Sequence, residues 1–234
     1  MQDFGSSFTQ SMGLILSGDP YLVGIVLLSL KVSIIALVLA AIIGLPLGAM
    51  LATARFPGRT AIIVFVNALM GLPPVVVGLG LYLMLSRSGP FGVLDLLYTP
   101  TAMIIAQMVL ITPILTALTR QAIEDLNEEY SELLQSFRLG WWARIKVLLW
   151  DSRFALITAL LAGFGRATAE VGAVIIVGGN INHVTRVMTT TIALETSRGN
   201  LALAMALGTI LLLIALAVNA ALALLGRSTR RAYA

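Results

Sequence analysis

The sequence contains no cysteine and only one histidine, His183. Without cysteine there is no disulfide bond, no thiolate nucleophile and no thiolate metal site. A single histidine also excludes a metal site built from several imidazole rings. No segment matches the G-x-x-x-x-G-K-[ST] loop that cradles nucleotide phosphates. We therefore expect no catalytic residues, no metal and no cofactor in this chain, and we expect His183 to be a solvated loop residue.

Charged residues are also scarce: they make up 11% of the 234 residues, while hydrophobic residues make up 59% and mean hydropathy is +0.97. A soluble domain is about half apolar and roughly a quarter charged. So large an apolar excess cannot be buried inside a water-soluble domain of this size, which indicates an integral membrane protein. The net charge of +4 is carried at the ends of apolar runs, so we expect lipid rather than nucleic acid as the partner.

Five apolar runs are long enough to cross the hydrocarbon core, which takes about 20 helical residues. They are residues 32–54, 60–86, 96–119, 154–177 and 199–226. The sequence therefore predicts an all-α membrane protein with about five transmembrane helices. We divide it into an outer segment 1–31, a transmembrane domain 32–226 that includes a long loop 120–153, and a tail 227–234.

The N-terminal segment has no basic residues before its apolar run, so a cleaved signal peptide is not expected. One helix over residues 21–54 would be about 51 Å long, which exceeds the hydrocarbon core. We therefore expect residues 14–30 to form a helix along the outer interface that turns into the membrane near Lys31.

The basic residues set the expected orientation, because cytoplasmic loops carry an excess of lysine and arginine. One side of the membrane receives ten of the fifteen basic residues: Arg55, Arg59, Arg120, Arg138, Arg144, Lys146, Arg153, Arg227, Arg230 and Arg231. The other side receives Lys31, Arg87, Arg186 and Arg198, while Arg166 lies inside a span. The sequence thus predicts a cytoplasmic C-terminus and an N-terminus outside.

The loop 120–153 carries apolar residues at helical spacing on both sides of Gly140. The pattern predicts two amphipathic helices joined near Gly140: Leu126, Tyr130, Leu133, Leu134 and Phe137 before it, and Trp141, Trp142, Ile145, Leu148 and Leu149 after it. These helices could lie on the membrane surface with their tryptophans at the headgroups. Alternatively, they could form a docking element for a cytoplasmic partner.

Three predicted spans contain proline, and the first of them contains Pro46. Adjacent prolines Pro73 and Pro74 remove two backbone donors and predict a break or kink in the second span. The third span contains Thr112 followed by Pro113. Irregular backbone is tolerated in a membrane where it is buried in protein or lines a water-filled cavity, so these residues are candidates for a translocation path.

The fourth span contains two opposite charges, Arg166 and Glu170, four residues apart. This spacing places them on the same side of a helix, and each charge would be costly alone in lipid. They could form an ion pair that holds the helix bundle together. They could also border a permeation path or its gate.

Five spans, an outside N-terminus and a long helical loop before the fourth span resemble the permease subunit of a type I ABC importer. That family carries E-A-A-x3-G-x9-I-x-L-P in this loop. The best register places Glu132 at the glutamate, Leu133 and Leu134 at the alanines, and Arg138 at the glycine. The alternative register uses Gly140 as the glycine and loses the glutamate. The resemblance implies that residues 132–140 couple the permease to an ATPase, and we expect Leu133, Leu134 and Phe137 to be exposed there and to fill a groove on the ATPase.

Other segments resemble the oxyanion branch of this family. Residues 29–33 (S-L-K-V-S) and 55–59 (R-F-P-G-R) are similar to molybdate and sulfate permeases. The segments most similar to tungstate permeases are residues 71–78, 86–90, 163–172, 177–181 and 194–197. The resemblance implies a homodimer in the bacterial or archaeal plasma membrane, two cytoplasmic ATPase subunits that carry ATP and Mg, and an extracytoplasmic oxyanion-binding protein. The cargo would be tungstate, or alternatively molybdate or sulfate.

Two other classes remain open from the residues themselves. An ion-coupled secondary transporter would need ion-coupling groups and usually repeated halves, but no duplicated half is visible and Glu170 is the only acid inside a predicted span. A membrane enzyme would need clustered histidines or acids at a membrane face. The acids here gather in the loop 120–153, without histidine.

Overall fold

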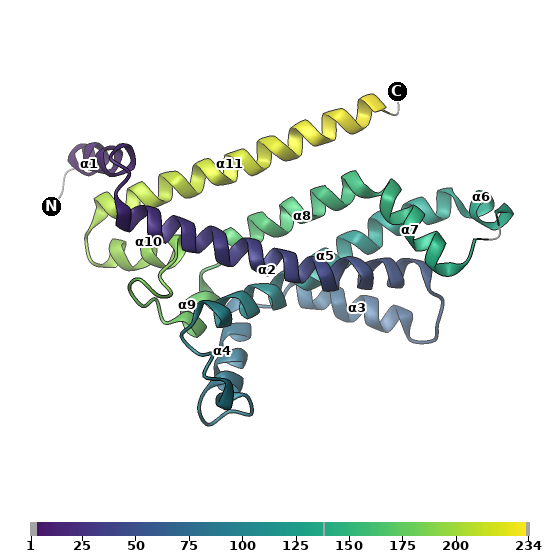
Figure 1. Ribbon diagram of the computed structural model, residues 1–234, viewed down its shortest axis with the longest axis horizontal. Helices are drawn as coiled ribbons and strands as arrows, with labels where there is room; N and C mark the ends of the chain where they lie inside the picture. The colour runs from purple at the N-terminus through teal and green to yellow at the C-terminus, as the bar shows by residue number, and fades with distance from the viewer. Residues whose placement is uncertain (1–3, 138, 233–234) are drawn as a thin grey trace. The chain divides into compact units, whose positions relative to one another are not determined.

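The computed structural model describes residues 4–137 and 139–232, and every regular element within these ranges is a helix (Figure 1). This confirms the all-α prediction. In chain order the elements are α1 (Phe4–Leu16), α2 (Pro20–Thr53), α3 (Arg59–Met70), α4 (Pro74–Leu85), the short 3₁₀ helix η1 (Gly92–Leu94), α5 (Pro100–Glu129), α6 (Ser131–Ser136), α7 (Trp141–Asp151), α8 (Arg153–Thr168), α9 (Gly172–Gly178), α10 (Met188–Ser197) and α11 (Leu201–Ala232).

Three helices, α2, α5 and α11, are each long and apolar enough to cross a membrane. Two sharply bent pairs, α3 with α4 and α7 with α8, bring the number of candidate spans to as many as five, in agreement with the sequence. The second and fourth predicted spans, however, are not single helices. The chain breaks between α3 and α4, and again between α8 and α9.

The prediction for the N-terminal segment was wrong. α1 ends at Leu16, and α2 is one helix of 34 residues that passes through Lys31 without turning. Its start is fixed by Asp19, whose Oδ1 accepts hydrogen bonds from the N–H groups of Tyr21 and Leu22, both at 3.0 Å, with Pro20 as the first helical residue. The length argument failed because it required the whole helix to fit within the hydrocarbon core.

The chain forms two compact units. The first unit comprises the residues up to Ala36 together with Pro73–Gln107 and Gly165–Asn219, and the second comprises Leu37–Leu72, Met108–Phe164 and the residues from Ala220 onward. The helices α2, α5 and α11 each contribute residues to both units. The two breaks in the predicted spans lie in or at the edge of the first unit.

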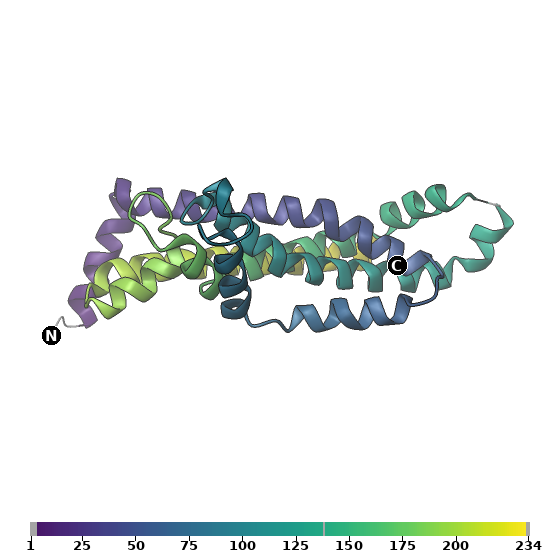
Figure 2. The same cartoon turned by 90° about the horizontal axis from the view of Figure 1, so that it is seen from below.

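In the second unit, α2 packs closely on α5. A Cβ atom on Gly48 would lie only 2.6 Å from the Thr116 carbonyl oxygen, and one on Gly44 only 3.0 Å from Leu115 Cβ. Small residues four apart allow membrane helices to approach this closely. Leu51, Val66 and Ala117 then join α2, α3 and α5 in one buried cluster. Figure 2 shows the ribbons of these three helices running alongside one another.

In the first unit, α4 packs on α9 with equally little space. A Cβ atom on Gly78 would lie 2.8 Å from the Ala173 Cα atom, and one on Gly172 would lie 2.9 Å from a Val75 methyl group. A second cluster around Leu22, Met188 and Leu207 joins α2, α10 and α11, with Leu14 of α1 packed against it. The first unit therefore holds both helix breaks in a tightly packed setting.

Candidate functional site

The break between α8 and α9 places Glu170 outside regular helix. Its side chain is only 3% exposed, and Oε1 accepts a hydrogen bond from the Ala173 N–H at 3.1 Å. Thr189 of α10 donates its hydroxyl to the Glu170 carbonyl oxygen at 2.8 Å. The Glu170 carboxylate therefore accepts a backbone N–H in the first turn of α9, which has no partner within the helix. Thr189 of α10 supplies a donor for the Glu170 carbonyl oxygen, which the break leaves without a helical partner.

Glu170 also forms the expected ion pair with Arg166, with Nη1 and Oε2 2.5 Å apart. The two partners differ in burial, because the Arg166 side chain is 35% exposed and the Glu170 side chain only 3%. The pairing is confirmed, but its geometry is not that of two residues on one helix, since α8 ends at Thr168. A buried carboxylate needs such a partner, because an unpaired charge in a low-dielectric interior is strongly destabilising.

Gln107 of α5 completes this polar centre. Its Nε2 donates to the Ala167 carbonyl oxygen at 3.1 Å, whereas its buried Oε1 meets no donor among the described residues. A cavity of about 10 Å³ lies beside it, also lined by Ser29, Ser33, Glu170 and Thr189. This volume is at the lower limit for holding a single water molecule. Sequence reasoning missed Gln107, although an amide in an otherwise apolar run is the kind of buried polar group that needs partners.

The double proline breaks the second span as predicted. Pro73 is extended, with φ −63° and ψ 124°, and Pro74 is the first residue of α4. Pro74 and Val75 lie against Gly172, two residues after Glu170. The two breaks, which lie about a hundred positions apart in the chain, thus come together in the first unit.

Thr112 and Pro113 do not form a break. They lie in the second unit, inside the uninterrupted helix α5, where Pro113 is buried. The Thr112 hydroxyl donates to the Met108 carbonyl oxygen at 2.7 Å. This side-chain bond stays within the helix, so the pair adds no exposed backbone group to the centre around Glu170.

The predicted coupling residues fall on α6 and the turn that follows it. Leu133 and Phe137 are 53% and 66% exposed, and Glu132 is exposed as well. Leu134 is not the exposed residue we expected, since only 5% of it is accessible. It packs into the core of the second unit with Ala49, Ala52, Ile123, Ile145 and Leu148. Arg138 lies outside the described residues.

The loop 120–153 differs from prediction in its first half. α5 continues to Glu129, so Leu126 belongs to the third span helix, and a break at Tyr130 separates it from α6. The second half agrees with the sequence, since Gly140 caps α7 at Trp141. Leu134 of α6 packs with Ile145 and Leu148 of α7, so α6 and α7 form a hairpin that packs on the second unit. Leu133 and Phe137 leave one apolar face of this hairpin exposed.

A second ionic group, which sequence reasoning also missed, lies in the second unit. Glu124 of α5 pairs with Arg120 on the same helix and with Arg59 at the start of α3, the latter at 2.6 Å. Arg59 Nε also donates to the Leu51 carbonyl oxygen at 2.6 Å. The turn between α2 and α3 is thereby tied to α5, next to a cavity of about 950 Å³ that Trp141 and Arg144 of α7 also line.

Comparison with known proteins gives a consistent result. The family described as "Binding-protein-dependent transport system inner membrane component" matches residues 44–231. A "Probable anion ABC transporter permease protein" of Haloferax volcanii is 41% identical over 86% of this chain and 88% of its own length. The "Tungstate uptake system permease protein TupB" of Peptoclostridium acidaminophilum is 39% identical over 94% of this chain and 96% of its own.

The TupB protein of Campylobacter jejuni is also 39% identical, over 91% of this chain and 89% of its own length. Permeases named for sulfate and molybdenum transport are more distant, at 28% and 29% identity over 72% and 68% of this chain. The matches cover nearly all of the helices described above, including both breaks and the hairpin. The chain therefore belongs to the binding-protein-dependent inner membrane components, the multi-pass permeases of ABC importers.

Proposed function

We propose that this chain is the permease of an ATP-driven importer that carries tungstate from an extracytoplasmic binding protein into the cytoplasm. The observation that carries the proposal is the 39% identity, over more than nine tenths of this chain, to two proteins named as tungstate uptake permeases. ATP and Mg are bound by a partner ATPase, and this chain contributes no catalytic residue.

The ATPase docks on the segment 132–140. Leu133 and Phe137 present an open apolar face there, while Leu134 anchors the segment to α2, α5 and α7. An apolar helix face received by a groove is a common mode of helix recognition. Closure of the ATPase pair would move the hairpin and, through Leu134, the helices of the second unit.

The anion path runs beside the two helix breaks of the first unit. Arg166 and Glu170 border this path, and Pro73 and Pro74 shape the break that lies against Gly172. Since five spans are few to enclose a polar path, two copies of the chain form it as a homodimer. A path with few fixed cations suits a transported dianion, because conduction needs sites weak enough to release the ion.

The C-terminus is cytoplasmic in this proposal, on the evidence of the ten-to-four distribution of basic residues. The cysteine-free chain allows a direct test with single cysteines at Ser88, Asn182 and Ser228. A membrane-impermeant thiol reagent added to intact cells should label the first two, and Ser228→Cys only after lysis. Labelling of Ser228→Cys in intact cells would reverse the orientation.

Deleting this chain should abolish tungsten accumulation in cells supplied with nanomolar tungstate, because no other subunit provides the membrane path. Elemental analysis of washed cells, with tungstate or molybdate as the supplied anion, measures the loss. Molybdenum accumulation serves as the internal comparison. If tungsten accumulation is unchanged and the uptake of molybdate or sulfate is lost, the cargo is that anion and not tungstate. Molybdenum and sulfate are the cargoes for which the more distant permeases are named.

An ion-coupled secondary transporter remains the alternative of another class. It would move its cargo without an ATPase and would couple it to an ion through a group such as Glu170. The Arg166–Glu170 ion pair argues against this role, because a carboxylate neutralised by an arginine is a poor site for a coupling cation.

A further inference from the structure

The first unit contains a cavity of about 510 Å³ at the N-terminal end of α2. It is lined by Pro20, Tyr21, Gly24, Ile25 and Leu28 of α2, and by His183 and Arg186 of the loop before α10. Its floor is apolar, and its polar groups are concentrated at the Tyr21, His183 and Arg186 side. A Cβ atom on Gly24 would contact nothing within 4 Å, so there is open space beside this lining residue.

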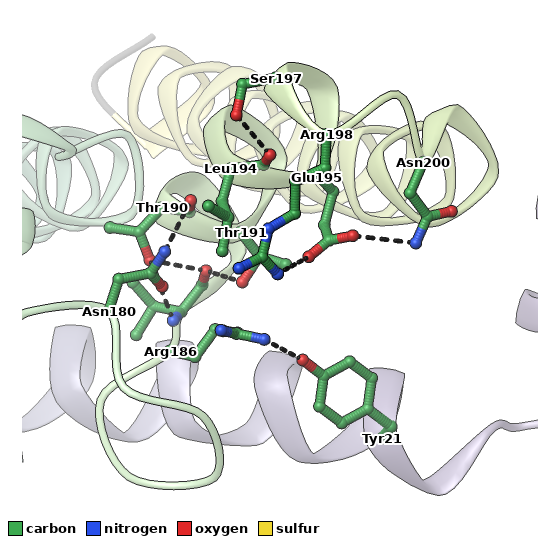
Figure 3. A network of polar contacts seen from close by, with 11 residues as sticks. Tyr21, Asn180, Arg186, Thr190, Thr191, Leu194, Glu195, Ser197, Arg198 and Asn200 are labelled. Atoms are coloured by element: carbon green, nitrogen blue, oxygen red, sulfur yellow. Dashed lines mark hydrogen bonds and ion pairs between the residues drawn. The ribbon is translucent and has the colours of Figure 1, made fainter.

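Among the residues that the structure describes, Arg186 has no partner of opposite charge. The hydrogen bond it makes to them is from Nη1 to the Tyr21 hydroxyl oxygen at 2.5 Å (Figure 3). Its Nε is buried and has no acceptor among the described residues. A buried donor left without an acceptor is destabilising, and an unpaired charge is more so. The structure therefore leaves a half-buried cation with unused donors beside an open cavity.

Two acids of the first unit, Asp19 beside Tyr21 and Glu195 of α10, are engaged with other groups. Asp19 accepts the N–H groups of Tyr21 and Leu22 at the start of α2. Glu195 is bound by Arg198 Nη1 at 3.4 Å and by Asn200 Nδ2 at 2.9 Å, as Figure 3 shows. Of the arginines drawn there, Arg198 has a carboxylate and Arg186 has none. An anion in the cavity would supply the missing charge.

The loop that carries Arg186 is held rigidly. Thr185 donates its hydroxyl to the Gly178 carbonyl oxygen at 2.5 Å and accepts the Ile181 N–H at 2.9 Å. Asn180 and Thr190 exchange two hydrogen bonds, at 2.9 and 3.3 Å. The His183 ring meets the Tyr21 ring edge to face, with centroids 5.5 Å apart. Arg186, Tyr21 and His183 are thus held near one another before any ligand arrives, which lowers the entropic cost of binding.

We propose that Arg186, with Tyr21 and His183, binds a tetrahedral oxyanion group in this cavity. The planar guanidinium offers paired N–H donors whose spacing matches two oxygens of such a group. The oxyanion group has two possible sources. One is the phosphate of a membrane lipid, whose acyl chain would lie along the apolar residues Gly24, Ile25 and Leu28. The other is a free dianion of the transported kind. The site differs from the centre at Glu170 and does not depend on transport activity.

The test uses the purified full chain, with any subunits that co-purify, and measures its melting temperature. The first probe is phosphatidylglycerol, and its control is diacylglycerol with the same acyl chains. The second probe is sodium tungstate, and its control is sodium chloride of equal ionic strength. A ligand at about 100 times its dissociation constant should raise the melting temperature by roughly 5–10 °C. Arg186→Gln should abolish the rise, whereas Arg198→Gln should retain it.

A rise with phosphatidylglycerol alone identifies a lipid phosphate, and a rise with tungstate identifies the free anion. Either result supports the site if it is lost in Arg186→Gln. If that variant fails to fold, Tyr21→Phe removes only the hydroxyl that orients the guanidinium and should weaken binding roughly 3- to 10-fold. The proposal is overturned if neither probe gives a rise, or if the rise persists unchanged in the Arg186 and Tyr21 variants. Because this assay involves no transport, failure here leaves the importer proposal standing.

Discussion

Glu170→Ala is expected to destabilise the protein by about 1–3 kcal/mol, because it leaves a buried backbone donor without its acceptor and leaves Arg166, which is 35% exposed, without its ionic partner. That donor is the Ala173 N–H at the start of α9. For a chain of this length the loss corresponds to a melting temperature lower by roughly 2–12 °C. Fluorescence-detected size exclusion of heated, detergent-solubilised protein measures the shift. A melting temperature equal to that of the wild type would show that the ion pair contributes nothing to the fold.

Matched variants separate the charge from the hydrogen bond. Glu170→Gln keeps an oxygen for the Ala173 N–H and should be less harmful than Glu170→Ala. The pair Arg166→Gln with Glu170→Gln removes both charges together and should recover much of the loss. The exchange Arg166→Glu with Glu170→Arg should recover only part of it, because an arginine at position 170 cannot accept the Ala173 N–H. Full recovery by the exchange would show that the helix cap is unimportant.

Phe137→Asp is expected to detach the ATPase without unfolding the permease. Phe137 is 66% exposed, so the fold does not depend on it, whereas loss of one apolar anchor at an interface costs about 2 kcal/mol or more, which is roughly a 30-fold loss of affinity. Co-purification of the ATPase with a tagged permease measures the effect, and Leu133→Asp should behave alike. Trp150→Ser, an exposed change on α7 outside the segment, is the control and should retain the ATPase.

Leu134→Asp should give a different result from its neighbours. Leu134 is 5% exposed and belongs to a buried apolar cluster of the second unit, so a carboxylate there should prevent folding rather than only docking. Yield and elution profile of the permease alone distinguish the two effects. If Phe137→Asp and Leu133→Asp both keep the ATPase, the segment 132–140 is a membrane-surface helix and not the coupling element.

Composition and apolar run length predicted the helical membrane class and the number of candidate spans, because these depend only on local hydrophobicity. They could not separate α3 from α4 or α8 from α9 as individual helices, although Pro73 and Pro74 correctly marked one break. The second break has no proline. It depends on contacts from Gln107 and Thr189 that come from distant parts of the chain.

The start of α2 was readable from local chemistry. Asp19 followed by Pro20 is a typical helix start, and a membrane helix is free to extend beyond the hydrocarbon core.

The burial of Leu134 could not be predicted from local chemistry, because Leu133 and Leu134 are adjacent and equally apolar. Which of them faces the core is decided by α7, which closes over α6 and brings Ile145 and Leu148 to Leu134. The Arg166–Glu170 pair was found because charges in an apolar run must find partners.

The most direct test of the proposed function is uptake by proteoliposomes that contain this chain and its co-purifying ATPase, with the binding protein and tungstate outside. The importer predicts tungsten accumulation inside, measured by elemental analysis, that requires both ATP on the ATPase side and the binding protein. Phe137→Asp should abolish this accumulation. Accumulation driven by an ion gradient in the absence of ATP would contradict the proposal and would assign the chain to the secondary transporters.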